Sequence, residues 1–182
     1  MEPDVAGTGR VASGLTPAAV VLPVIGDGAA RRLLFTRRAP DLDTHPGQMS
    51  FPGGRAEASD DSLLATALRE AREEVGLDPA TVSVVDRLDP IETVTGFHVE
   101  AFVALVPDGP FIPQDSEVAE VVTLPVTAFL DETGYEQERH DHPDRGATAV
   151  HYFHVDGYTV WGATARLLVQ YLADTEGWHP PA

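Results

Sequence analysis

Three glutamates in the first half of the chain have the spacing of a metal site. Glu70, Glu73 and Glu74 stand three and four residues apart, so on a helix their carboxylates would gather on one face. Like charges at this spacing cost a helix about 0.2–0.5 kcal/mol, and anions near a helix C-terminus oppose its dipole. A hard cation such as Mg2+ or Mn2+ would neutralise them, because it takes carboxylate and phosphate oxygens as ligands. The spacing therefore indicates metal-assisted chemistry on a phosphate.

The composition supplies a plainer alternative. The chain has 182 residues, with 29 Asp and Glu against 12 basic residues, all of them Arg, and a formal net charge of −17. In such a background, three glutamates could simply be a solvated acidic helix face. Taken alone, the three residues favour this alternative, so the choice depends on the surrounding sequence.

The glutamates belong to a segment that predicts a helix over residues 62–75. Its apolar residues recur at i, i+4, i+7 and i+11 and form one face: Leu64, Leu68, Ala71 and Val75. Asp61 and Ser62 are candidate N-caps, and Gly76 is a favourable residue just past the C-terminus. A Gly-rich turn at Gly53-Gly54 precedes this helix.

This combination resembles the signature of the Nudix hydrolase superfamily. That signature has a glycine, five residues, a glutamate, seven residues and then Arg-Glu-aliphatic-any-Glu-Glu-any-Gly-aliphatic. Residues 69–77, REAREEVGL, match its second half, with Ala71 as the small apolar residue. In the first half, we align Asp61 with the usual glutamate, which makes the loop after Gly54 one residue longer.

The resemblance implies roles for individual residues. Such enzymes cleave a nucleoside diphosphate linked to another group, with Mg2+ or Mn2+ bound. Glu70 and Glu74 would be metal ligands, Glu73 a third ligand or the general base, and Arg69 would orient a neighbouring glutamate. Glu117 on a later loop is a second candidate for the base, although a surface or capping role is slightly favoured for it. The Gly53-Gly54 turn would bring a backbone carbonyl near the metal.

A second motif lies upstream and resembles coenzyme A pyrophosphatases within that superfamily. It comprises residues 34–39 (LFTRRA), Asp43 where the motif has Arg, Gly47, and residues 51–54 (FPGG). Residues 161–166, WGATAR, add to this likeness, which spans about residues 17–173. The implied substrate is coenzyme A or a thioester of it, and the implied products are phosphopantetheine and adenosine 3′,5′-bisphosphate.

Cations near this motif are candidate phosphate ligands. Arg31, Arg32, Arg37 and Arg38 form the densest basic cluster, and Arg favours bidentate phosphate contacts. The alternative is that these arginines pair with surrounding acids on an exposed strand. His45 could contact a phosphate or could pack in its loop. With Gly53 and Gly54, we take Arg37, Arg38 and His45 as candidate substrate-binding residues.

The remaining segments predict the fold. Strands are expected at residues 16–25, 31–37, 82–85, 97–106 and 158–161, a hairpin at 134–154, and helices at 125–130 and 163–173. Strands come in groups with helices between them, which predicts an α/β fold: a Nudix-type α/β/α sandwich with a mixed β-sheet. We expect a flexible N-terminal tail over residues 1–15, a single domain over 16–176 and a C-terminal tail over 177–182.

The composition also argues against several classes of protein. A nucleic-acid partner would require a basic patch, and a membrane span would require about 20 consecutive apolar residues. The acidic charge balance argues against the first, no apolar run approaches that length, and the first ten residues lack the pattern of a secretory signal. We expect a cytoplasmic enzyme, monomer or homodimer, whose partner is a small nucleotide substrate. The rival hypotheses are a Nudix hydrolase of ADP-ribose, a dinucleotide or a nucleoside triphosphate, and a Nudix-fold binding module without turnover.

The acidic excess itself predicts adaptation to salt. Biased nucleotide composition would replace Lys by Arg, yet Arg has not increased to compensate. An acidic surface keeps a protein soluble where salt screens charges within ~3 Å at 1 M, compared with ~10 Å at 0.1 M. We therefore hypothesise a salt-rich cytoplasm and expect the melting temperature to rise as KCl is raised towards molar concentration. Full stability in dilute buffer, in a thermal melting series against KCl, would contradict this hypothesis.

Overall fold

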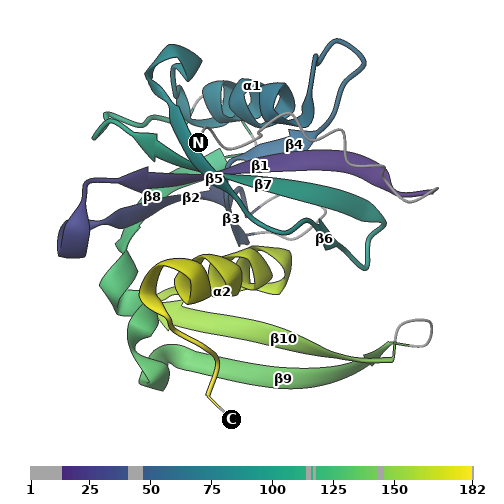
Figure 1. The fold of residues 1–182 in the computed structure, drawn as a ribbon, viewed down its shortest axis with the longest axis vertical. Coiled ribbons are helices and arrows are strands. Elements are labelled where there is room, and N and C mark those ends of the chain that lie inside the picture. Colours follow the sequence, from purple (N-terminus) through teal and green to yellow (C-terminus); the bar gives the residue numbers. More distant parts are fainter. Residues whose placement is uncertain (1–13, 41–46, 114–115, 117, 143–145, 182) are drawn as a thin grey trace.

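The chain folds in layers (Figure 1). The computed structural model describes residues 14–40, 47–113, 116, 118–142 and 146–181. Helix α1 (Leu63–Val75) covers one face of a large mixed sheet, and helix α2 (Gly162–Glu176) covers the other. The predicted α/β/α sandwich with a mixed sheet is confirmed. Beyond α2 lies a further layer, a separate antiparallel sheet.

The large sheet is organised around strand β1 (Thr16–Ile25). β1 runs parallel to β7 (Phe97–Val106) along its whole length, while its other neighbours are antiparallel. The remaining strands of this sheet are β2 (Arg32–Arg38), β3 (Met49–Ser50), β4 (Gly53–Arg55), β5 (Ser83–Arg87), β6 (Ile91–Glu92) and β8 (Val118–Pro125). The segment before Pro125, ambiguous from sequence, is thus a strand beside β2. The short helix expected after it is the 3-10 helix η3 (Val126–Leu130).

The strand β1 has two different partners on one edge. Its C-terminal residues Val24 and Ile25 pair with β2, whereas Ala18, Ala19 and Val20 pair with β4. β3 in turn pairs with the far end of β2. The two short strands therefore occupy the space where β1 and β2 diverge. This arrangement fixes the Gly53-Gly54 segment within the sheet, directly below α1.

Both faces of the large sheet are buried. Ala19, Val21 and Leu34 face α1 and pack against its small residues Ala67 and Ala71. The opposite face packs on α2, in a core that holds a run of aromatic rings: Phe35 on β2, Phe51, Phe129 on η3 and Phe153 on β10 of the second sheet. Burial on both faces explains why β1 and β7 read as nearly continuous apolar runs.

The second sheet consists of β9 (Tyr135–His142), β10 (Gly146–Val155) and β11 (Tyr158–Trp161). The hairpin was predicted, but not its separation from the large sheet. Tyr158 connects the two sheets, because its hydroxyl donates to Glu120 on β8 at 2.7 Å. Trp178 packs on Tyr135 and Phe153, with ring centroids 5.2 and 5.5 Å away. Packing thus continues past residue 176, while residues 1–13 of the expected N-terminal tail lie outside the described residues.

Helix α1 begins and ends where the sequence predicts. The Ser62 hydroxyl accepts a hydrogen bond from the Ala65 amide at 3.1 Å, and Gly76 ends the helix with φ of 72°. Only residues without a Cβ penalty adopt this left-handed conformation readily. In the described part of the chain, neither α1 nor any other helix is long and apolar enough to cross a membrane.

Candidate active site

The Gly53-Gly54 segment and α1 approach each other closely, and two glutamates lie in the contact. The Gly53 amide donates to Oε2 of Glu74 at 3.0 Å. A Cβ on Gly54 would lie 2.6 Å from the carboxyl carbon of Glu70, a distance that real side chains do not reach. Only glycine at this position allows the Glu70 carboxylate to rest on the strand. The structure therefore brings together Glu70, Glu74, Gly53 and Gly54, four of the residues proposed from sequence.

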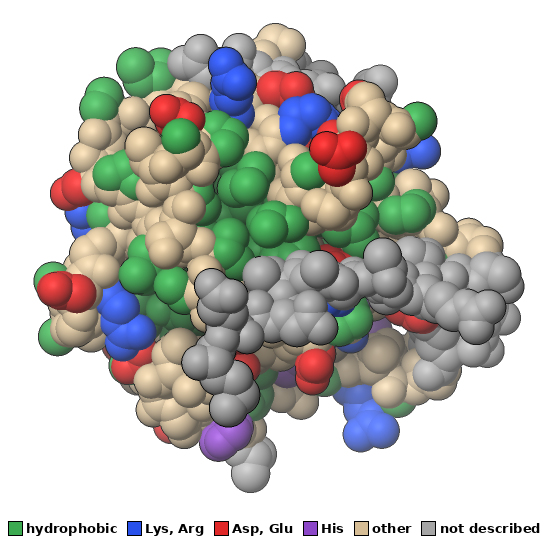
Figure 2. Space-filling view, turned by 45° about the horizontal axis from the view of Figure 1, so that its top comes forward, with side chains coloured by type: hydrophobic (Ala, Val, Ile, Leu, Met, Phe, Trp, Pro, Cys, Tyr) green, Lys and Arg blue, Asp and Glu red, His purple; other side chains and the backbone are tan. Residues whose placement is uncertain are grey.

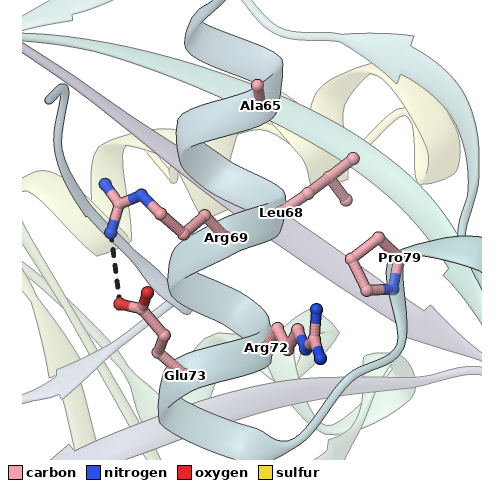
Figure 3. Close-up of a pocket in the computed structure, with 6 residues that line it drawn as sticks. All are labelled: Ala65, Leu68, Arg69, Arg72, Glu73 and Pro79. Atoms are coloured by element: carbon pink, nitrogen blue, oxygen red, sulfur yellow. Dashed lines mark hydrogen bonds and ion pairs between the residues drawn. The ribbon is translucent and has the colours of Figure 1, made fainter. Parts of the chain in front are cut away.

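Arg69 holds the acidic groups around it. Its Nη1 donates to Glu70 at 3.0 Å and to Glu73 at 3.1 Å, and Figure 3 shows the second of these contacts. Its Nη2 donates to the Arg55 carbonyl at 3.2 Å. Its strongest partner is Asp60, which it binds with two nitrogens at 2.9 and 3.1 Å. Such a bidentate pair fixes both side chains. Arg69 thus contacts two of the neighbouring glutamates, and its orienting role stays a prediction.

The structure corrects the assignment of Asp61. Asp61 is exposed, whereas the Asp60 side chain is only 6% accessible and bonds Arg69 and the Thr66 hydroxyl. Asp60 follows Gly54 after five residues, so the loop has the ordinary spacing and the extra residue lies between Asp60 and α1. Hydrogen bonding by Arg69 holds the pKa of Asp60 well below its usual range, and Asp60 in turn raises the pKa of Arg69. The spacing from Gly54 was the signal that could have identified Asp60.

The other two carboxylates differ in environment. Burial raises the pKa of the Glu70 carboxyl despite its contact with Arg69. Glu73 is 55% exposed and points to solvent. Burial disfavours the ionised form of such a carboxylate, and a nearby cation would stabilise that form.

The donor set fits a divalent cation that also binds substrate. Among the described residues, no three His, Asp or Glu side chains converge as a preformed cage. Glu70 and Glu74 face the glycine segment as a pair, one turn apart on α1. Mg2+ characteristically takes one or two carboxylates and completes its shell with water and substrate phosphates. Glu70 and Glu74, beside the Gly53-Gly54 segment, could supply the two carboxylates that Mg2+ binds in this way.

The basic cluster upstream is largely engaged with acids. Arg31 binds Glu176, Arg32 binds Asp108 at 2.8 Å, and Arg37 binds Glu120 at 3.1 Å. These ion pairs agree with the alternative that the arginines of this cluster pair with surrounding acids. Arg38 also has interactions of its own. His45 and Glu117 lie outside the described residues.

A groove of about 670 Å³ lies along α1, and Glu73 lines it whereas Glu70 and Glu74 do not. It is lined by Ala65, Leu68, Arg69, Arg72, Glu73 and Pro79. In Figure 3, Arg69 and Glu73 lie on one side of the helix, and Arg72 reaches towards Pro79 on the other. The face in Figure 2 shows hydrophobic side chains gathered in the middle with charged side chains around them.

Comparison with known proteins agrees with this geometry. The model of the NUDIX domain family matches residues 14–152. The chain belongs to the Nudix family. It is 38% identical over 161 residues to an uncharacterized Nudix hydrolase, NudL, from Enterobacter sp. (strain 638), covering 83% of this chain and 78% of that protein. It is accordingly a Nudix hydrolase, a pyrophosphohydrolase of a nucleoside diphosphate derivative, in a family that generally uses divalent metal ions.

Solved structures support the fold. The NUDIX domain of Shewanella oneidensis NrtR, crystallised with ADP ribose, superposes with a TM-score of 0.52 at 18% identity, covering 62% of this chain and 74% of that one. A MutT/nudix family protein from Enterococcus faecalis gives a TM-score of 0.54 at 16% identity, covering 91% of this chain and 65% of that one.

Alanine at the two glycines should have opposite effects. In Gly53→Ala the new Cβ meets the Ala19 carbonyl oxygen at 2.3 Å, and backbone cannot move aside cheaply, so we expect a loss of about 3 kcal/mol in stability. In Gly54→Ala the clash is with the flexible end of Glu70, so stability should change by less than about 1 kcal/mol. Diphosphate hydrolysis should nevertheless fall about 10–100-fold. Urea unfolding and steady-state rates measure both, and equal stability losses would contradict this account of the contact.

Asp60 and Asp61 form a matched pair for testing the Arg69 contact. Asp60→Asn should lower the unfolding free energy by about 1–3 kcal/mol, because Arg69 loses its bidentate partner. Asp61→Asn, at an exposed carboxylate, should change it by less than about 0.5 kcal/mol. Because the folded-state pKa of Asp60 is lowered, its stabilisation is full above an unfolded-state pKa of about 3.9 and is lost as pH falls below it. The difference between the variants, measured by urea unfolding, should therefore shrink on acidification.

Proposed function

We propose that this Nudix hydrolase cleaves the diphosphate of coenzyme A or acyl-coenzyme A. Water adds across the phosphoric anhydride, giving phosphopantetheine and adenosine 3′,5′-bisphosphate. The observation that carries the proposal is the continuity of the upstream motif with the site. Residues 34–38 lie in β2, and residues 51–54 include the glycine segment on which Glu70 and Glu74 rest. A substrate bound along this motif would have its diphosphate beside the two glutamates.

The chemistry requires charge neutralisation. A diphosphate repels an incoming hydroxide, and a bound Mg2+ or Mn2+ lowers both this repulsion and the pKa of a coordinated water. Glu70 and Glu74 would hold the ion. Arg69 keeps the Glu70 carboxylate in place through its Nη1 contact, and Asp60 in turn fixes Arg69. Glu73, exposed at the edge of the site, is a candidate general base, and Glu117 remains the other.

ADP-ribose is the second candidate substrate. The related NUDIX domain of NrtR was crystallised with ADP ribose, which shares an adenosine diphosphate with coenzyme A. We infer the coenzyme A class from the upstream motif, and the cytoplasm as the compartment that holds this substrate. A Nudix-fold binding module without turnover is the remaining rival, and the retention of Arg69, Glu70, Glu73 and Glu74 argues against it.

The decisive experiment is a substrate panel. Coenzyme A, acetyl-coenzyme A, ADP-ribose and a diadenosine polyphosphate are incubated with Mg2+ or Mn2+ in buffers up to molar KCl, and products are separated by chromatography. We expect adenosine 3′,5′-bisphosphate from coenzyme A. Cleavage of ADP-ribose with coenzyme A untouched would overturn the substrate assignment, and no turnover of any compound would support the binding module.

A single substitution tests the metal ligand. Glu74→Gln keeps the shape of the side chain but weakens an oxygen ligand, so the rate should fall by roughly two orders of magnitude or more. The melting temperature should stay within a few degrees of the parent. Glu132→Gln, at an exposed carboxylate away from α1, is the control. Activity close to the parent in Glu74→Gln would remove this residue from the metal site.

A further inference from the structure

The Nη1 atom of Arg69 has a third glutamate beside it. Nη1 lies 3.0 Å from Oε1 of Glu70 and 3.1 Å from Oε2 of Glu73, and Oε1 of Glu57 follows at 3.9 Å. The Nε and Nη2 atoms are both bound by Asp60. Nη1 is therefore the atom of Arg69 that reaches the proposed metal ligand Glu70. The Glu57 carboxylate stands next to this contact, just beyond hydrogen-bond distance.

The backbone of Glu57 is fixed, whereas its carboxylate is exposed. The Glu57 amide donates to Oδ2 of Asp60 at 2.9 Å, and the Glu57 carbonyl accepts from the Asp60 amide at 3.1 Å. Because Asp60 also binds Arg69, the same buried carboxylate anchors both the loop and the guanidinium. The Glu57 side chain is 61% exposed and accepts from the Ser59 hydroxyl at 3.4 Å. A movement of roughly 1 Å would bring its carboxylate into hydrogen-bond range of Nη1.

Electrostatics favour this movement once Glu70 binds a cation. Burial raises the pKa of the Glu70 carboxyl, Arg69 opposes that effect, and the nearby charges of Glu73 and Glu57 add to it. A divalent ion held by Glu70 and Glu74 would attract the carboxylate that now binds Nη1, and it would repel the guanidinium. Arg69 then needs another acceptor for Nη1 in order to keep its place.

We propose that Glu57 is that acceptor and takes over the Nη1 hydrogen bond of Arg69 when Glu70 binds the divalent ion. The proposal rests on the proposed function, because it takes Glu70 as a metal ligand. Glu57 is a positioning residue, since it acts on Glu70 through Arg69. Glu73 already bonds Nη1 (Figure 3), but a candidate general base must be able to accept a proton. A further acceptor for Nη1 leaves Glu73 available for that role.

The test measures Mn2+ affinity by calorimetry, without substrate, in variants of one loop. Glu57→Gln removes the charge beside Nη1, and we expect the affinity to fall roughly 3- to 10-fold, less than for a buried partner of a metal ligand. Asp61→Asn removes an equal charge at an exposed position of the same loop, and its affinity should stay within about twofold of the parent. Glu57→Asp keeps the charge on a side chain one methylene shorter, so it should not restore the parent affinity.

Urea unfolding of the metal-free proteins distinguishes positioning from a structural role. Without metal, Arg69 keeps its contacts with Asp60, Glu70 and Glu73. Glu57→Gln should therefore unfold at the same urea concentration as the parent, as an exposed substitution does. A residue that only stabilised the loop would lower that concentration.

The outcomes separate this proposal from the proposed function. Parent affinity in Glu57→Gln or Glu57→Asp, equal losses in Glu57→Gln and Asp61→Asn, or a destabilised metal-free Glu57→Gln would each overturn the role of Glu57. If the parent binds Mn2+ but cleaves no coenzyme A, the substrate assignment fails, while a selective loss of affinity in Glu57→Gln still supports this role. A parent that binds no Mn2+ would overturn the metal site and this proposal together.

Discussion

The close approach of a helix to a glycine strand is the constraint on which the site depends. Two glutamates one turn apart on α1 reach the sheet because Gly53 donates an amide to one and Gly54 leaves space for the other. The cost is a concentration of negative charge near a helix C-terminus. Arg69 offsets it by contacting two of the glutamates and Asp60 together. The fold thus holds several carboxylates close together and, among the described residues, the Arg69 guanidinium is the one cation that they share. A divalent ion bound between them would further stabilise their ionised forms.

Much of the fold could be predicted because the relevant signals are local. The limits of β1, β7 and β11 follow from apolar runs bounded by turn residues, and α1 follows from its periodicity and Gly76. The sequence could not reveal that β9, β10 and β11 form their own sheet, because strand partnership depends on contacts distant in sequence. The segment before Pro125 was ambiguous for the same reason. Its residues suit a helix or a strand, and pairing with the distant strand β2 makes it a strand.

The site was predictable to the extent that it is a linear motif. The helix glutamates, Arg69 and both glycines are brought together as their spacing indicates. The error at Asp61 arose because two adjacent aspartates satisfy similar spacings, and only burial distinguishes them: Asp60 turns inward to Arg69. The arginines illustrate the other limit. Their density near the motif suggested phosphate binding, but whether a cation is available depends on acids such as Asp108 and Glu176, which are remote in sequence.

The parallel pairing of β1 with β7 has a consequence for how the protein folds. Thr16 lies opposite Phe97, and the loop between them contains β2, β4 and all of α1. Closing so long a loop is entropically costly and makes parallel pairing slow. During synthesis, helix α1 emerges well before β7, which supplies Phe102, Ala104 and Val106 to the α1 side of the core. Until β7 pairs, the apolar face of α1 lacks this part of its packing surface, and the five charged residues on the rest of the helix, three Glu and two Arg, favour its solubility.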